Sequence, residues 1–481
     1  MLLAASVTRF LSQAGAAMNA TWTYISETQS IFGTIFGLLL LTVTTQVSRA
    51  SEASKHGDVL KLIKMAIVSS IALGMVGEII MLVTVTSIET LFEGNDKLLP
   101  NADELMYAQA SAFVLTVVLS AGFAVMFGRN ELVFLALSLM PAVFIFVAAA
   151  VTFKQSENLA IFVGANILIA VQLCIFIVYR IRQICQSLAK EKDVPGSPGL
   201  FSLGELSVKD DWIPFVKRGA NVLMRTLTLG FKTFLSMLFA TRLNNVTGSL
   251  MNVLQTLSGP LFGLSAFLGL GSVTFLAKVL ERRDVAGFRK TLRMACCAYY
   301  GAAALFVLFS IVTGTSFVLK YADQHEDPDY VDVYSALNHF FWYAGVVAQS
   351  MGNFYDGFLL CFLDWTFIGY LYSLDFLLVF LPILLGTQYS SLPISGLGTP
   401  VEGVDKFGGI LLANLVHGIV RCIAAAWRVH GHHMITGLFA DDVRPSRGSS
   451  FETLARSALP KSPRDDDDQA HQELASMNDH L

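Results

Sequence analysis

The sequence predicts an all-α, polytopic membrane protein of two parallel six-helix lobes, with an incomplete first helix and about 11 full transmembrane helices. Three observations predict this fold class: the composition, a series of apolar segments and an internal repeat. Hydrophobic residues make up 54% and charged residues only 15% of the 481 residues. A soluble domain of this length cannot bury so much apolar surface and still present a charged exterior.

Eleven apolar segments follow one another along the chain, and each approaches or reaches the roughly 20 residues that one helical bilayer crossing needs. They are 31–47, 63–85, 107–126, 132–153, 159–179, 220–240, 250–276, 296–319, 336–363, 367–385 and 409–427. Residues 1–20 are apolar but are interrupted by Arg9 and Gln13. We expect this stretch to be the end of a first helix whose beginning is missing, so that the chain is N-terminally truncated.

The distribution of basic residues predicts the orientation. Most Lys and Arg lie in alternate loops, at 49–64, 129, 180–218 and 278–293. The positive-inside rule assigns these loops to the cytoplasm or to the equivalent face of an organelle.

A gapless repeat relates the two halves of the chain at an offset of 226 residues. Among the identical pairs are Asn19 and Asn245, Thr21 and Thr247, Gln29 and Gln255, Asp58 and Asp284, and Lys64 and Lys290. Because an offset of six helices returns the chain to the same side of the membrane, the repeats are parallel, as in transporters built of two six-helix halves.

The repeat predicts the domain organisation. We expect an N-terminal transmembrane lobe at 1–184 and a C-terminal lobe at 212–430. The linker between them, 185–211, is rich in charge, Pro, Gly and Ser. Residues 431–481 have low hydrophobicity and mixed charge, which predicts a disordered cytoplasmic tail.

Three stretches of the sequence resemble the multidrug and toxic compound extrusion (MATE) family of cation-coupled antiporters. Residues 7–66 look like the end of the family's helix 1, helix 2 and the start of helix 3, and 219–284 look like helices 7 and 8. NFYDGFLLCFLDWTFIGY, at 353–370, is similar to helix 10 of the branch with DNA-damage-inducible bacterial members and plant plastid relatives. Two features depart from that branch. The acidic first helix is mostly absent, and Leu268-Gly269 stands where many relatives have Asp-Gly.

This resemblance implies a secondary active transporter that works by alternating access. It would exchange protons or sodium for small organic compounds of cationic or amphipathic character, without a cofactor. Two alternatives stay open: an organic-anion or lipid-linked exporter of the same fold, and a non-transporting membrane scaffold or regulator.

Ionisable residues at membrane depth are the candidates for cation coupling, because their burial is costly without a function. Asp356 lies in the middle of its segment, beside Gly357, and Arg225 is its expected ion-pair partner. Asp364, two turns further on, is either a coupling residue or a cap at the membrane interface. Asp375 is a weaker candidate, and Lys232 shares a helix face with Arg225.

Four polar residues are candidates for lining a substrate cavity: Gln29, Gln255, Glu78 and Asn353. The two glutamines hold equivalent repeat positions and either line the cavity or hydrogen-bond between helices. Glu78 lies either near the outer surface or in the cavity. We also expect His417 and Arg421, four residues apart on the last apolar segment, to pair with each other.

The sequence contains no Gly-rich phosphate loop, no nucleophile–base arrangement and no His/Cys spacing typical of a metal site. We therefore expect no enzyme activity, no catalytic residues, no cofactor, no metal and no nucleic-acid partner. The expected partners are the lipid bilayer, a small organic substrate and H+ or Na+, with the chain acting as a monomer. Plasma, vacuolar and plastid membranes are all compatible with the sequence.

Overall fold

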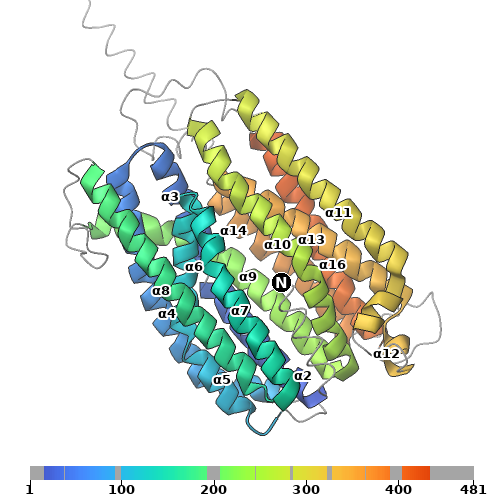
Figure 1. Ribbon diagram of the computed structural model, residues 1–481. Helices are drawn as coiled ribbons and strands as arrows, with labels where there is room; N and C mark the ends of the chain where they lie inside the picture. Colours follow the sequence, from blue (N-terminus) through green and yellow to red (C-terminus); the bar gives the residue numbers. More distant parts are fainter. Residues whose placement is uncertain are drawn as a thin grey trace, which may run out of the picture. The chain divides into compact units, whose positions relative to one another are not determined.

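The computed structural model describes residues 16–36, 38–92, 99–191, 206–243, 245–281, 285–321, 328–362, 364–389 and 404–433 (Figure 1). These residues form helices joined by short turns, and no β-strand occurs within the described ranges. The predicted all-α fold class is confirmed. Residues 1–15, where the first helix was expected to end, lie outside the described part of the chain.

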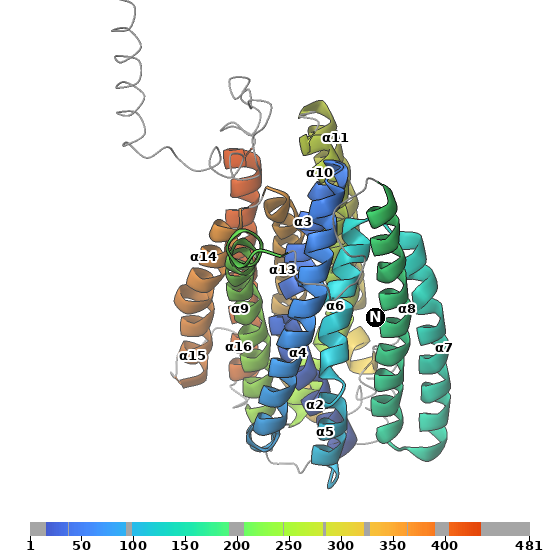
Figure 2. The same ribbon diagram turned by 90° about the vertical axis from the view of Figure 1, so that its left-hand side faces the viewer.

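The first half of the chain contributes seven helices to the described structure. They are α2 (Ala16–Phe36), α3 (Leu38–Glu52), α4 (His56–Phe92), α5 (Ala102–Ala110), α6 (Phe113–Gly128), α7 (Leu132–Ser156) and α8 (Ala160–Glu191). Helices α3, α4, α6 and α8 pack against one another, and α7 packs on α8 (Figure 2).

The second half begins with a π-helical turn, η1 (Val208–Trp212). It continues with α9 (Ile213–Leu243), α10 (Asn245–Glu281), α11 (Val285–Tyr321), α12 (Pro328–Val333), α13 (Ala336–Cys361), α14 (Trp365–Asp375), the π-helical turn η2 (Phe376–Phe380), α15 (Leu381–Tyr389) and α16 (Val404–Trp427). Helix α13 is the centre of this half, because it packs against α10, α11, α14 and α16. A separate short π-helical segment, η3, spans Arg428–His433.

Where the structure describes them, the eleven predicted apolar segments lie on helices, apart from short turns. Seven described helical stretches are long and apolar enough to cross a membrane, or eight if α5 and α6, which are bent by 42°, form one crossing. Helix α13 is missing from this set because its buried face carries polar side chains, among them Gln349 and Asp356, that lower its hydropathy. Residue 37, between α2 and α3, lies outside the description.

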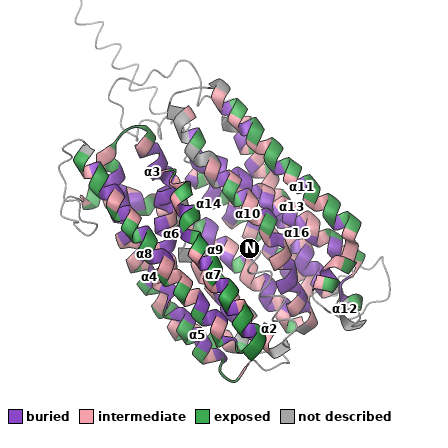
Figure 3. Cartoon of the chain, viewed as in Figure 1, coloured by how far each residue is buried: buried purple, intermediate pink, exposed green. Residues whose placement is uncertain are grey.

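Exposed residues line the outer surface of the helices (Figure 3), and many of them are large and apolar. Val133 and Phe144 of α7 are 76% and 75% exposed, and Val312 of α11 is 75% exposed. A soluble monomer rarely exposes such continuous apolar surface, whereas a bilayer covers it without cost. The chain is therefore a multi-pass membrane protein.

Both copies of the predicted repeat are helical. Residues 19–36 and 38–52 lie in α2 and α3, and their counterparts 245–262 and 264–278 lie in α10. The two halves meet where α2 and α3 pack against α9 and α10, so the contact involves both copies. Helix α8 continues to Glu191, past the predicted start of the linker at 185. The predicted tail beyond residue 433 lies outside the described residues, and the lobe boundaries remain predictions.

Candidate functional site

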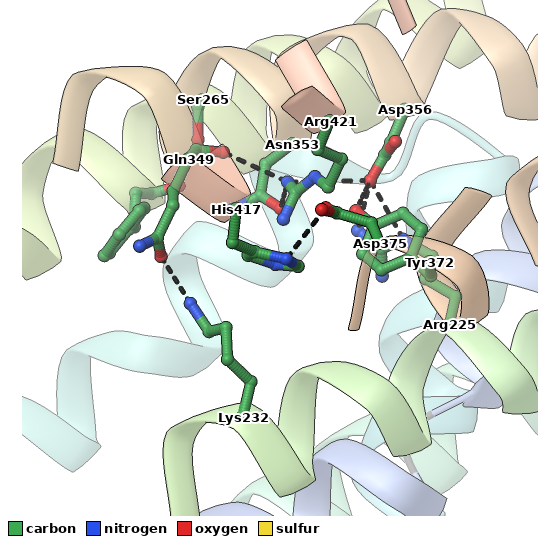
Figure 4. A network of polar contacts seen from close by, with 11 residues as sticks. Arg225, Lys232, Ser265, Gln349, Asn353, Asp356, Tyr372, Asp375, His417 and Arg421 are labelled. Atoms are coloured by element: carbon green, nitrogen blue, oxygen red, sulfur yellow. Dashed lines mark hydrogen bonds and ion pairs between the residues drawn. The ribbon is translucent and has the colours of Figure 1, made fainter. Parts of the chain in front are cut away.

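Polar side chains from four helices of the second half converge in the protein interior (Figure 4). We call this set the polar network. It consists of Arg225 and Lys232 of α9; Gln349, Asn353 and Asp356 of α13; Tyr372 and Asp375 of α14; and Asn414, His417 and Arg421 of α16. Its ionisable members are deeply buried: Asp356, Asp375, His417 and Arg421 are at most 3% exposed.

Helical periodicity explains why these residues meet. The network residues of α13 are spaced four and then three apart, those of α16 three and then four apart, those of α14 three apart, and those of α9 seven apart. Each spacing returns a side chain to the same face of a helix. Each of the four helices therefore presents one polar stripe, and the stripes face one another because the remaining surface is apolar.

Asp356 is the most heavily coordinated member of the network. Its Oδ2 atom accepts a hydrogen bond from Arg225 Nε at 3.0 Å and lies 2.9 Å from Arg225 Nη2. The hydroxyl of Tyr372 donates to the same oxygen. Arg421 Nη2 lies 3.9 Å from it. Through these contacts Asp356 of α13 joins α9, α14 and α16.

The ring of Tyr372 also contacts both guanidinium groups. The guanidinium carbon of Arg225 lies 5.2 Å from the ring centroid, and that of Arg421 lies 4.7 Å from it. Cations at these distances are attracted by the electron-rich ring face. Tyr372 and Asp356 together hold the two arginines close to each other despite their like charge.

Arg421 has further partners on α13. Its Nη2 donates to the backbone carbonyl of Gln349 at 3.0 Å and to Oδ1 of Asn353. Gly352 makes room for this contact, because a Cβ atom there would lie 2.6 Å from Arg421 Nε. A side chain at this position would displace the guanidinium group.

Lys232 lies at the other end of the network. Its Nζ donates to Gln349 Oε1 at 2.6 Å, and Gln349 Nε2 donates to the carbonyl of Asn414 at 3.0 Å. Asn414 Nδ2 in turn donates to Ser236 Oγ of α9 at 2.9 Å. This chain of hydrogen bonds links α9, α13 and α16.

Asp375 and His417 form a second acid–base contact. Asp375 Oδ2 lies 2.8 Å from His417 Nδ1, at the junction of α14 and η2 with α16. The two side chains approach in the middle of the network (Figure 4). With three basic side chains, two carboxylates and one histidine, cations outnumber anions in the network when the histidine is neutral. Such a set of charges at membrane depth is costly and is typical of a functional site.

The structure confirms the contact between Arg225 and Asp356 that the sequence predicted. It also brings Asn353, Lys232 and Asp375 into the same network. Their roles in coupling or substrate binding stay predictions.

The expected pairing of His417 with Arg421 is not what the structure shows. His417 contacts Asp375, while Arg421 contacts α13 and Tyr372. Both side chains share a helix face as expected, but the neighbouring helices offer a carboxylate to one and oxygen acceptors to the other.

The remaining candidates lie elsewhere. Asp364 occupies the N-cap position of α14, where its side chain makes no capping hydrogen bond. Gln29 on α2, Gln255 on α10 and Glu78 on α4 are each partly exposed. Whether these three line a cavity stays a prediction.

Tyr372, Gln349 and Asn414 were not singled out from the sequence. Uncharged polar residues are common in membrane helices, where they hydrogen-bond between helices, so each is unremarkable alone. The sequence feature that could have identified them is their helical spacing from the charged residues on the same helix. Among the described residues, no group of three or more His, Cys, Asp or Glu side chains is arranged to hold a metal ion.

No protein-family model matches the sequence, and no significant match was found among curated proteins. The fold, however, is similar to solved transporter structures. A eukaryotic MATE transporter, AtDTX14, matches with a TM-score of 0.68 at 14% identity, covering 95% of this chain and 94% of that chain. A mutant of the MATE transporter VcmN from Vibrio cholerae matches with a TM-score of 0.63 at 15% identity, over 89% and 94% of the two chains.

A third similar structure is a MOP superfamily transporter from Pyrococcus furiosus. Its TM-score is 0.64 at 13% identity, and the match covers 89% of this chain and 91% of that chain. That protein is described as having a binding pocket of reverse polarity, which suggests a different function for it. At these identities, the likenesses establish that the chain has the fold of MATE transporters.

Proposed function

We propose that this membrane protein is a secondary active transporter that exports small organic compounds, of cationic or amphipathic character, in exchange for protons or sodium. The fold of MATE transporters supports transport as the general activity. The observation that carries the proposal is the polar network of the second half. Buried charges at membrane depth are retained in helical bundles chiefly where ions or substrates move.

The contacts between the two halves support alternating access as the mechanism. Arg49 at the end of α3 donates to the carbonyl of Cys361 at the end of α13. Arg218 of α9 donates to Gln46 of α3 at 3.0 Å. Both contacts lie at the helix ends that the positive-inside rule assigns to the cytoplasm. A path open to the cytoplasm would separate α3 from α9 and α13, so these hydrogen bonds would break on opening.

The network supplies a means of coupling. It connects α9, α13, α14 and α16 through hydrogen bonds and ion pairs, so a change in its charge alters how these four helices pack. Binding of a coupling cation would thereby bias the second half toward one of two conformations. The substrate would be released on the opposite side because the cation and the substrate favour different conformations.

A second candidate function is export of an organic anion. The excess of basic over acidic side chains in the network favours it, because a cationic interior attracts anions and repels cations. The Pyrococcus furiosus transporter of this fold, with its pocket of reverse polarity, makes this alternative specific enough to test.

Transport by the purified full chain in proteoliposomes tests both candidates. Uptake of ethidium, an organic cation, and of carboxyfluorescein, an organic anion, would be measured under an imposed pH gradient or sodium gradient. We expect gradient-driven ethidium uptake that is lost in Asp356→Asn and retained in Glu131→Gln. Glu131 is the matched control because its ion pair with Arg180, at 2.9 Å, lies outside the network and is partly exposed.

The other outcomes are equally informative. Gradient-driven uptake of carboxyfluorescein alone would replace the first candidate by the second. Indifference of both probes to both gradients would contradict coupled transport and support a scaffold or regulator.

A further inference from the structure

The two carboxylates of the polar network differ in their partners. Oδ2 of Asp356 accepts hydrogen bonds from Arg225 and Tyr372. Neither oxygen of Asp375 accepts a hydrogen bond from any residue that the structure describes, although Asp375 is only 3% exposed. A buried ionised carboxylate without donors is costly, because the interior does not replace the hydrogen bonds it made to water.

His417 is the closest polar neighbour of Asp375. Its side chain is fully buried, and Nδ1 lies 2.8 Å from Asp375 Oδ2. The two groups are within ion-pair distance, although neither ring nitrogen makes a hydrogen bond within the described part of the chain. The ring of Phe380 packs against the imidazole at 5.8 Å between centroids and excludes water on that side.

We propose that Asp375 and His417 form the proton-binding site of this protein, with one proton held between Asp375 Oδ2 and His417 Nδ1. Proton binding forms one N–H or O–H bond and raises the charge of the network by one. Proton release restores the carboxylate and the neutral imidazole. The use of this site in transport rests on the function proposed above.

The pair lies among other charged side chains of the network (Figure 4). Lys232 of α9 and Arg421 of α16 are the cations whose charge acts on both groups, and they favour the carboxylate after the proton has left. Helix α13 contributes the uncharged side chains of Gln349 and Asn353 to this part of the network. Its Asp356 and the Arg225 of α9 largely neutralise each other.

The same surroundings disfavour sodium at this position. Hard metal cations take several oxygen ligands. Asp375 instead contacts the imidazole of His417 and feels the charges of Lys232 and Arg421, which repel a metal ion. A proton needs only one donor–acceptor pair.

Infrared difference spectroscopy of the full chain between acidic and alkaline pH tests the site without a transport assay. We expect a carboxylic-acid C=O band on acidification that is lost in Asp375→Asn, retained in Glu131→Gln and shifted in pH midpoint in His417→Gln. If Asp375→Asn does not fold, Asp375→Glu must change the frequency of the same band. A band unaffected by substitution of Asp375, or lost in Asp356→Asn instead, would overturn the proposal.

Transport measurements in proteoliposomes distinguish an error in the proposed proton-binding site from an error in the proposed transport function. Loss of pH-driven uptake in Asp375→Asn, with retention in Glu131→Gln, supports the site as the coupling element. Undiminished pH-driven uptake in Asp375→Asn overturns its role and leaves the transporter function intact. If the infrared band of Asp375 is observed but the protein shows no gradient-driven uptake, the proton-binding site is supported and the proposed transport function is contradicted.

Discussion

Gly357 of α13 and Gly269 of α10 cross with their backbones in contact. A Cβ atom added to Gly357 would lie 2.5 Å from three backbone atoms of Gly269. Real Cβ atoms do not approach a backbone so closely, and small residues at such crossings let membrane helices approach. Since Gly357 follows Asp356 directly, the crossing fixes the height and rotation at which Asp356 enters the network.

Substitution of Gly357 by Ala is expected to destabilise the protein by about 1–3 kcal/mol, the usual cost of overpacking a tight contact. The helices would have to separate, so thermal unfolding in detergent should show a lower midpoint. Gly301→Ala on α11 is the matched control, because a Cβ there meets nothing within 4 Å. That variant should be neutral or slightly more stable, since Ala favours helix over Gly. Equal midpoints for the two variants would contradict the close crossing.

Removal of the Tyr372 hydroxyl should weaken the network without removing its cation–π contacts. Tyr372→Phe leaves the ring beside Arg225 and Arg421 but deletes the hydrogen bond to Asp356. We expect a loss of about 1.5–3 kcal/mol in unfolding free energy, as for hydrogen bonds to charged groups. Tyr372→Leu should lose more, because the aromatic ring goes as well. Chemical denaturation of the two variants measures the difference.

The charge excess of the network predicts an asymmetry between its paired residues. Asp356→Leu removes a carboxylate that two guanidinium groups approach, whereas Arg225→Met leaves Asp356 with Tyr372 and with Arg421 at 3.9 Å. Breaking a buried ion pair costs about 3–5 kcal/mol. We expect the full cost in the aspartate variant and a smaller one in the arginine variant, measured by thermal unfolding. The reverse order would show that the excess positive charge is balanced elsewhere.

The hydrogen bond from Arg49 to Cys361 should influence which side of the protein is open. Arg49→Ala removes a contact between the halves at the predicted cytoplasmic end. We expect faster labelling of Cys361, which is buried, by a membrane-impermeant maleimide added from that side.

The matched control for this labelling experiment is Lys61→Ala. Its pair with Asp211, at 3.2 Å, also lies at this end of the protein but is partly exposed. Such a pair contributes little, so the labelling rate should stay close to that of the wild type. Unchanged labelling in Arg49→Ala would contradict a role of this contact in closure.

The sequence predicted the contact between Arg225 and Asp356 because opposite charges at bilayer depth have few alternatives to each other. It predicted the helices themselves because length and hydrophobicity follow the bilayer. The pairing of His417 with Asp375 could not be predicted in this way. His417 and Arg421 share a face, and only the position of α14 beside α16 decides which of them meets the carboxylate.

The contacts of the uncharged network residues could not be predicted from the sequence for a related reason. Gln349 accepts from Lys232 and Tyr372 donates to Asp356, but nothing in their side chains forces a contact. The repeat predicted which helices correspond between the halves, while the charged residues of the network lie outside both of its copies. The internal repeat therefore predicted the arrangement of the helices in two halves but not the location of the site.

The π-helical turn Phe376–Phe380 has a consequence for how α14 and α15 present their side chains. Residues five apart in a regular α-helix point about 140° away from each other. Asp375 and Phe380 are five apart, yet both are buried and both lie beside His417. The wider turn thus aligns an acid and an aromatic ring on one imidazole, while Leu378 between them faces outward. A regular α-helix of the same length would leave the imidazole with the acid or the ring, but not with both.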